Sequence, residues 1–157
     1  MSGFRRGVRI GIDVGKARVG VARCDPDGML AVPVETVPRS ETSIDRIAEI
    51  AAEYEPLEFV VGLPVNMQGA DTASTTDARE FAEALQRRTG TTVRLVDERL
   101  STVSAHAALR SSGRNQKNSR SIVDQVAAVV LLQQAIDTEK STGKAPGAAI
   151  PFDEESH

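Results

Sequence analysis

The chain has 157 residues, with 19 Lys and Arg against 22 Asp and Glu, one Cys, two His, no Trp, one Tyr and four Phe. One cysteine cannot form an internal disulfide bridge, and with two histidines it cannot complete a zinc site, which excludes a disulfide scaffold and favours a reducing compartment. The longest apolar run, Val126 to Leu132, is far shorter than a membrane span of about 20 residues, and no secretory signal is visible. We therefore expect a cytoplasmic protein with no membrane partner.

Three β-strands are predicted within the first 37 residues. Residues 8–14 and 19–23 alternate in the manner of strands, and the Gly15-Lys16 step between them fits a hairpin. A third strand, 29–37, follows the turn sequence Asp25-Pro26-Asp27-Gly28 and contains Pro33, which favours an edge of the sheet. We expect these three strands to pair antiparallel in chain order.

The rest of the chain alternates helices and strands, and its helical crossovers should place the later strands parallel to the first. The fold class is therefore α/β, with a mixed five-stranded sheet in the order 3-2-1-4-5, strand 2 antiparallel, flanked by helices. One domain should cover residues 1–140, and we expect the acidic tail, 141–157, to be disordered. The predicted elements are a helix capped by Ser40, a buried strand at 57–62, a helix from Thr72 or Ser74 to Gly90, a strand at 92–96, a short helix from Ser101, and a helix from Ile122 to about Asp137.

Acidic residues follow two of these strands. Asp13 ends the first strand, Asp97 and Glu98 end the fifth, and Asp124 lies in the first turn of the last helix. Ligands of open α/β sheets gather at the carboxyl ends of parallel strands, and carboxylates that converge there repel one another unless cations lie between them. Oxygen ligands without His or Cys favour magnesium or manganese. Asp97 and Glu98 also fit a turn, and Asp124 fits a helix capping box equally well.

The chain resembles the bacterial YqgF/RuvX family in four segments: GIDVGKARVGVA from Gly11, VVGLPVNMQG from Val60, VDERLSTVSA from Val96 and IVDQVAAVVLLQ from Ile122. The resemblance implies an RNase H-like fold allied to Holliday junction resolvases, and a nuclease that matures the 5′ end of pre-16S rRNA in ribosome biogenesis. It also places metal-binding carboxylates at Asp13, Glu98 and Asp124. We take these three as the catalytic residues of a two-metal hydrolase, with Asp97 as the reserve metal ligand.

One position departs from the family pattern. The family has Gly-x-Lys-Arg after the first Asp, whereas this chain reads Gly15-Lys16-Ala17-Arg18, so the lysine is displaced by one residue. Because side chains alternate along a strand, the displacement favours Arg18 over Lys16 as the phosphate contact.

Basic residues are concentrated beside the predicted carboxylate site. No acid lies between Arg99 and Arg120, whereas residues 41–58 carry six acids and one Arg. This segregation predicts a nucleic-acid partner, and the scarcity of aromatic residues favours contacts to backbone and shape over base stacking. A basic loop that is merely solvated is the alternative. The predicted contacts are Arg18, Arg99, Arg110, Arg114, Lys117, Arg120 and Asn66.

Four functions compete. The leading prediction is a magnesium- or manganese-dependent endonuclease on structured RNA such as pre-rRNA, and the first alternative is a resolvase of branched DNA, which would favour a homodimer because two strands are cut symmetrically. A non-catalytic nucleic-acid-binding module would leave the acids unexplained. An ATP-dependent phosphotransferase, suggested by Gly-Ile-Asp-x-Gly between two strands, needs a second domain for which 157 residues leave no room. The sequence assigns no role to Cys24 or to the tail.

Overall fold

The computed structural model describes residues 4–64, 72–97 and 116–151, and within residues 116–124 it describes the backbone. The elements in these ranges are β1 (Arg9–Val14), β2 (Arg18–Cys24), β3 (Ala31–Pro38), α1 (Ser43–Tyr54), β4 (Glu58–Leu63), α2 (Ala73–Thr89), β5 (Val93–Asp97), α4 (Gln116–Thr142) and β6 (Ala148–Ala149).

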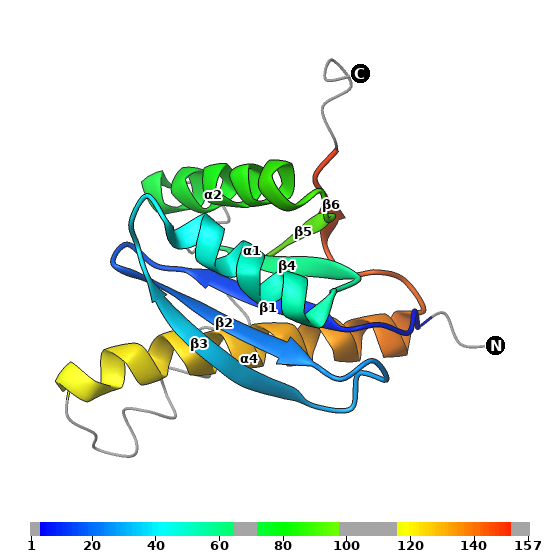
Figure 1. Ribbon diagram of the computed structural model, residues 1–157. Coiled ribbons are helices and arrows are strands. Elements are labelled where there is room, and N and C mark those ends of the chain that lie inside the picture. Colours follow the sequence, from blue (N-terminus) through cyan, green and yellow to red (C-terminus); the bar gives the residue numbers. More distant parts are fainter. Residues whose placement is uncertain (1–3, 65–71, 98–115, 152–157) are drawn as a thin grey trace.

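The strands form one mixed sheet in the order β3-β2-β1-β4-β5-β6 (Figure 1). Strand β2 runs antiparallel to both β1 and β3, while β1, β4 and β5 are parallel. This confirms the predicted order of five strands and the antiparallel strand 2. The difference is the sixth strand, β6, which pairs antiparallel with β5.

Strand β6 corrects the prediction for the C-terminal segment. Helix α4 continues to Thr142, and Ala148–Ala149 pairs with β5 inside the stretch expected to be disordered. The backbone N of Ile150 donates to the carbonyl O of Val93 at 2.9 Å. Backbone pairing with a strand about 50 residues earlier orders this segment, and composition alone gives no signal of such pairing. Residues 152–157 of the predicted tail lie outside the described residues.

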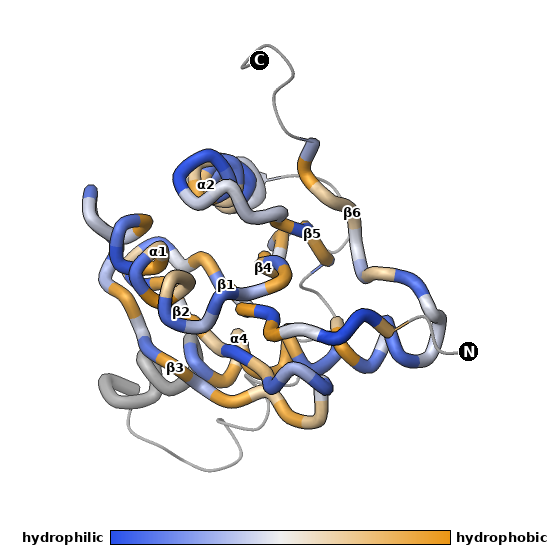
Figure 2. The backbone as a smooth tube through the Cα atoms, turned by 45° about the vertical axis from the view of Figure 1, so that its right-hand side comes forward, coloured by the Kyte–Doolittle hydropathy of each residue, from blue (hydrophilic) through white to orange (hydrophobic). Residues whose placement is uncertain are grey.

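Two layers of helices cover the sheet, α1 and α2 on one face and α4 on the other (Figure 1). Because side chains alternate along a strand, Ile10, Ile12 and Val14 of β1 pack in the core under α1 and α2. The intervening residues of β1, which include Gly11 and Asp13, face α4. Apolar residues lie mainly between the layers, and the outer side of α2 is hydrophilic (Figure 2).

Helix α2 has the ends that the sequence predicts. The Thr75 backbone N donates to Thr72 Oγ1 at 3.3 Å, and the Thr72 backbone N donates to Thr75 Oγ1 at 2.9 Å, which makes a reciprocal capping box. Gly90 ends the helix with φ of 72°, in the left-handed region that favours glycine. These caps fix the register of α2 above β4 and β5.

Gly11 sets the distance between β1 and α4, and Gly11→Ala is expected to destabilise the protein by about 1–3 kcal/mol. A Cβ at this position would lie 2.8 Å from Leu132 Cβ and 3.0 Å from the Ala128 carbonyl O, so α4 would have to move outward. Thermal unfolding should show a Tm lower by roughly 2–4 °C for each kcal/mol.

The matched control for Gly11→Ala is Gly90→Ala, where no atom lies within 4 Å of the added Cβ and only the positive φ opposes the change. We expect Gly90→Ala to lower Tm without affecting activity, whereas Gly11→Ala should lower both because it displaces α4. A wild-type Tm for Gly11→Ala would contradict the close approach of β1 and α4.

A cluster of three guanidinium groups and two carboxylates lies at the amino ends of the parallel strands, with Arg9, Glu58 and Glu139 buried and with Arg5 and Arg94 partly exposed. Glu139 accepts hydrogen bonds from the backbone N, Nε and Nη2 of Arg5 at 2.8, 3.2 and 2.9 Å and from Arg9 Nη2 at 2.9 Å. Glu58 accepts from both Nη atoms of Arg5 and from Arg94 Nε. The cluster joins the N-terminal segment, β1, β4, β5 and the end of α4.

The ion cluster should make stability depend on pH. Burial alone raises the pKa of Glu139, but hydrogen bonds from Arg5 and the charge of Arg9 outweigh burial, so this pKa is lowered. The stabilisation is therefore complete above the unfolded-state pKa of about 4.3 and is lost as the pH falls through the lower folded-state value. We expect the Tm difference between wild type and Glu139→Gln to shrink as the pH is lowered below about 4. A Tm difference between wild type and Glu139→Gln that stays constant below about pH 4 would contradict the lowered pKa of Glu139.

Candidate carboxylate site

Asp13 lies near the carboxyl end of the central strand β1 and is 8% exposed. Its neighbour on β2 is Gly20, which adds no side chain beside the carboxylate. Ile12 is paired with Val61 of β4, so Asp13 lies one position beyond that pair, at the level of Gly62. A nearly buried acid between two glycine positions is a place where a carboxylate can meet a ligand.

Helix α4 runs antiparallel to β1 and brings residue 124 to the level of Asp13. The direction follows from two contacts, since Arg9 pairs with Glu139 while Gly11 lies against Ala128 and Leu132. Asp13 is two residues beyond Gly11, about 6.6 Å along the strand. Asp124 is four residues before Ala128, about 6 Å along the helix and on the same helical face. The backbone therefore places positions 13 and 124 opposite each other.

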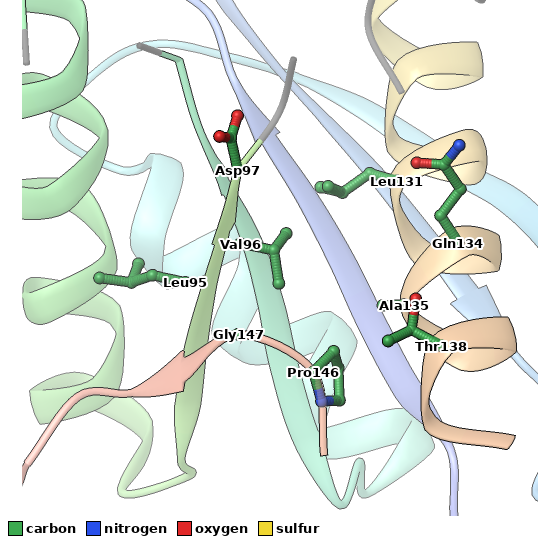
Figure 3. A pocket seen from close by; sticks show the side chains of 9 residues that line it. All are labelled: Leu95, Val96, Asp97, Leu131, Gln134, Ala135, Thr138, Pro146 and Gly147. Carbon is green, nitrogen blue, oxygen red and sulfur yellow. The ribbon is translucent and has the colours of Figure 1, made fainter. Parts of the chain in front are cut away.

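Asp97 ends β5 with its side chain exposed. In Figure 3 the side chains of Leu95 and Val96 point to opposite sides of β5, and Val96 points toward α4. By alternation Asp97 belongs to the Leu95 face, which is the face opposite Asp13. Glu98 lies outside the described residues, as does the predicted helix from Ser101.

The donor chemistry at this edge suits a hard divalent cation. Asp13 and Asp97 offer carboxylate oxygens, and the described residues provide no His or sulfur ligand at the carboxyl ends of the strands. Within the described parts of the chain no three acidic, His or Cys side chains form a cluster. The predicted ligand set includes Glu98 and the side chain of Asp124, which are not among the described groups.

The predicted nucleic-acid contacts are distributed unevenly over the structure. Arg18 is the first residue of β2, half-buried, and shares the α4 face with Gly20 and Asp13. Lys117 and Arg120 lie in the first turns of α4, where the backbone is described. Helix α4 begins at Gln116, six residues before the predicted start at Ile122. The other predicted contacts, Asn66, Arg99, Arg110 and Arg114, lie outside the described residues.

A pocket of about 230 Å³ adjoins this edge between β5, α4 and the segment that leads into β6 (Figure 3). Val96 and Leu131 supply apolar walls, Gln134 and Thr138 lie one helical turn apart on α4, and Asp97 marks the end nearest the carboxyl edge. Asp97 is the only charged group among the described residues that line the pocket. The pocket therefore does not suit a phosphate. Basic side chains that contact substrate phosphates must lie outside this pocket.

Two glycines that shape the site were not singled out from the sequence. Gly11 allows α4 to approach β1, and Gly20, the partner of Asp13 on β2, places no side chain beside it. Their signal is a glycine inside an otherwise β-branched strand, which marks a close approach of backbone or ligand.

A protein-family model described as "RuvX: Holliday junction resolvase" matches residues 7–138. The chain belongs to the RuvX family. Curated relatives carry the provisional name pre-16S rRNA nuclease: one from Clavibacter sepedonicus is 54% identical over 151 residues, covering 94% of each chain, and one from Leifsonia xyli subsp. xyli is 57% identical over 149 residues, covering 94% of this chain and 96% of the relative. The resemblance seen in the four sequence segments is thereby confirmed.

Solved structures similar to this RuvX-family chain share its fold. Thermus thermophilus RuvC in complex with a Holliday junction substrate has a TM-score of 0.56 and 17% identity, covering 91% of this chain and 99% of that chain. A second structure of the same RuvC has a TM-score of 0.54 and 18% identity. The RNase H-like fold class is therefore confirmed. Among the described helices of the RuvX-family chain, none is both long and apolar enough to cross a membrane.

Proposed function

We propose that this chain is a metal-dependent endonuclease that hydrolyses phosphodiester bonds in structured RNA, with the 5′ end of pre-16S rRNA as its substrate. The observation that carries the proposal is the nearly buried Asp13 at the carboxyl end of the central parallel strand, with residue 124 of α4 opposite it. Burial of an acid costs free energy unless a partner or a cation compensates its charge. The names of the relatives supply the substrate class. Because pre-rRNA is made in the bacterial cytoplasm, the proposal places the enzyme there.

Asp13, Glu98 and Asp124 are the proposed catalytic residues, and each would hold magnesium or manganese through carboxylate oxygens. When two such ions are bound, they activate water and stabilise the charge on the leaving oxygen. The protein supplies fixed ligands: Asp13 is paired with Gly20 of β2, β1 is paired with β4 up to Ile12, and α4 is held against β1 at Gly11.

Glu98 is the proposed ligand from the end of β5, with Asp97 in reserve. Asp13 and Val96 are on the α4 side of the sheet, and Asp97 is out of phase with them. In the sequence, Glu98 is the next residue after Val96 in the alternation of period two. The alternation favours Glu98 over Asp97, and cleavage assays of Asp97→Asn and Glu98→Gln test the choice directly.

Basic residues would hold the RNA backbone across this edge. Arg18 lies on the face of Asp13, and Lys117 and Arg120 belong to the end of α4 that approaches the site. Contacts of this type are made to phosphates and supply affinity with little sequence specificity. The full proposed set is Arg18, Arg99, Arg110, Arg114, Lys117, Arg120 and Asn66.

A four-way DNA junction is the second candidate substrate, because the family model is described as a Holliday junction resolvase. Symmetrical cutting of two strands would require a homodimer that presents two sites. The RNA substrate is the first choice because the close full-length relatives carry the rRNA nuclease name.

The proposal is tested by incubating purified protein with a pre-16S rRNA 5′ leader or with a four-way DNA junction, at matched salt concentration and with magnesium. We expect cutting of the RNA, loss of cutting in EDTA, and loss of cutting in Glu98→Gln and Asp124→Asn. Equal cutting by wild type and by the variants at positions 13, 98 and 124 would indicate a contaminant and reject the nuclease. Tight binding of RNA without cutting at any magnesium concentration would favour a non-catalytic binding module.

A further inference from the structure

The turn that joins β1 to β2, residues 15–18, is held by one residue from the end of β3. The Gly15 backbone N donates to the Arg18 carbonyl O at 2.8 Å and closes the turn. The Arg39 backbone N donates to the Ala17 carbonyl O at 2.9 Å, and Arg39 Nη1 donates to the Gly15 carbonyl O at 2.9 Å. Arg39 therefore binds two carbonyl groups of the same turn.

The guanidinium of Arg39 is itself fixed by α2. Its Nη1 and Nη2 atoms donate to the two carboxylate oxygens of Asp77 at 2.9 and 3.0 Å, and its central carbon lies 5.1 Å from the centre of the Phe81 ring. A bidentate pair on a stacked, planar cation holds one geometry, which a flexible lysine cannot reproduce. One side chain thus ties the turn, the end of β3 and α2 together.

The group that this turn presents is Lys16. Its side chain is exposed and makes no hydrogen bond or ion pair with the residues that the structure describes. The pKa of the nearby Asp77 carboxyl is lowered mainly by the hydrogen bonds from Arg39 and to a smaller extent by the charge of Lys16. Lys16 follows Asp13 by three residues, so its ammonium group is carried at the same edge of the sheet.

We propose that Arg39 is a positioning residue that holds the 15–18 turn and occupies Asp77, so that Lys16 remains available to a phosphate of the substrate backbone beside Asp13. The nature of the substrate rests on the proposed function. A lysine is a point charge on a flexible stem, so the backbone that carries it determines its reach. Without the Arg39 side chain the turn loses the hydrogen bond to the Gly15 carbonyl O, although the bond from the backbone N of residue 39 to Ala17 remains. The freed Asp77 carboxylate then competes with the phosphate for Lys16. Lys16 is thereby a second proposed phosphate contact beside Arg18, the residue that the sequence pattern favours for this role.

The salt dependence of RNA binding tests this inference, because log K falls with log salt by about 0.7 to 0.9 for each phosphate contact. Affinity for the RNA leader is measured without divalent cations, so that no cutting occurs. We expect Lys16→Gln and Arg39→Gln each to reduce the slope of log K against log salt by the value of one phosphate contact. The double variant should reduce this slope by no more than the value of one contact. In magnesium, kcat/KM should fall about tenfold or more in either single variant, with little further loss in the double variant.

Arg46→Gln is the matched control, because Arg46 also makes a bidentate pair, with Glu35, on the exposed surface between α1 and β3. It should leave the slope and kcat/KM unchanged, and Tm is measured for every variant. A double variant that loses two contacts would make Arg39 a phosphate ligand in its own right and overturn the proposal. An unchanged slope in folded Arg39→Gln would also overturn it.

Asp77→Asn decides the question if Arg39→Gln does not fold, because it weakens the pair with Arg39 and keeps the hydrogen bond to Gly15. Because Asp77→Asn also removes the carboxylate that would compete for Lys16, it should leave the affinity unchanged or higher in the wild-type background and have no effect in the Lys16→Gln background. A loss of affinity that is equal in both backgrounds would reject coupling through Lys16. Wild-type protein that binds RNA without cutting it would reject the proposed nuclease, while the slopes would still test Arg39. Wild-type protein that binds no RNA would reject the role of Lys16.

Discussion

Asp13→Asn is expected to reduce RNA cutting by about 10³-fold or more while the protein stays folded and continues to bind RNA. The change replaces a carboxylate with a neutral amide of the same shape, so the proposed metal ligand is lost and the packing is kept. Divalent ions contribute several kcal/mol to such reactions, and each 1.4 kcal/mol corresponds to about tenfold in rate. Single-turnover cleavage in magnesium measures the loss, and the Tm of the variant checks that the protein stays folded.

Asp45→Asn is the matched control for this prediction. Asp45 is an exposed acid of α1 that pairs with Arg88 of α2 at 3.2 Å, on the face of the sheet opposite α4. Its substitution should change neither the cleavage rate nor Tm by more than the small effect of a surface ion pair. Wild-type cutting by Asp13→Asn would remove Asp13 from the mechanism, and loss of binding together with cutting would assign it to substrate affinity.

Glu139→Gln is expected to destabilise the protein by about 3–5 kcal/mol, with a Tm lower by roughly 10 °C. The Glu139 side chain is 1% exposed and that of Arg9 is 2% exposed, so the substitution leaves a buried guanidinium charge without its carboxylate. Glu58 still compensates Arg5, but it makes no ion pair with Arg9 among the described contacts. Chemical or thermal unfolding near pH 7 measures the loss.

The control for the ion cluster is Glu49→Gln, which removes an ion pair of Arg46 whose glutamate is 68% exposed. Water replaces that interaction, and we expect a loss below about 1 kcal/mol. Equal destabilisation by the two substitutions would mean that burial adds nothing to the cluster.

The order of the sheet could be predicted from local patterns, because each step depends on residues close in sequence. A Gly-Lys turn predicts one hairpin, an Asp-Pro-Asp-Gly turn predicts the next, and each helical crossover returns the chain in parallel. The face of Asp13 follows from the same alternation, since it is in phase with Gly11 and out of phase with Ile12.

The interactions that stabilise this arrangement could not be predicted in that way. Arg5 and Glu139 are 134 residues apart, and Arg39 and Asp77 are 38 residues apart. Each of these residues looks like an ordinary surface charge in its own segment, and only the assembled sheet brings the pairs together. Strand β6 was missed for the same reason, because its partner β5 lies far away in sequence.

Asp124 illustrates an intermediate case. Its residue type and place at a helix start predict either a cap or a metal ligand, and the sequence alone does not separate them. The structure begins α4 at Gln116, so residue 124 lies two turns inside the helix. A cap acts only within the first turn, so this boundary removes the capping explanation.

The buried ion cluster and the carboxylate site occupy opposite ends of the same parallel strands, which has a practical consequence for engineering. Substitutions that strengthen the amino-end cluster should raise thermal stability without altering metal binding, because effects at well-separated sites are additive. An inactive Asp13→Asn protein made more stable at the other end would therefore be a suitable starting point for trapping the uncut RNA complex.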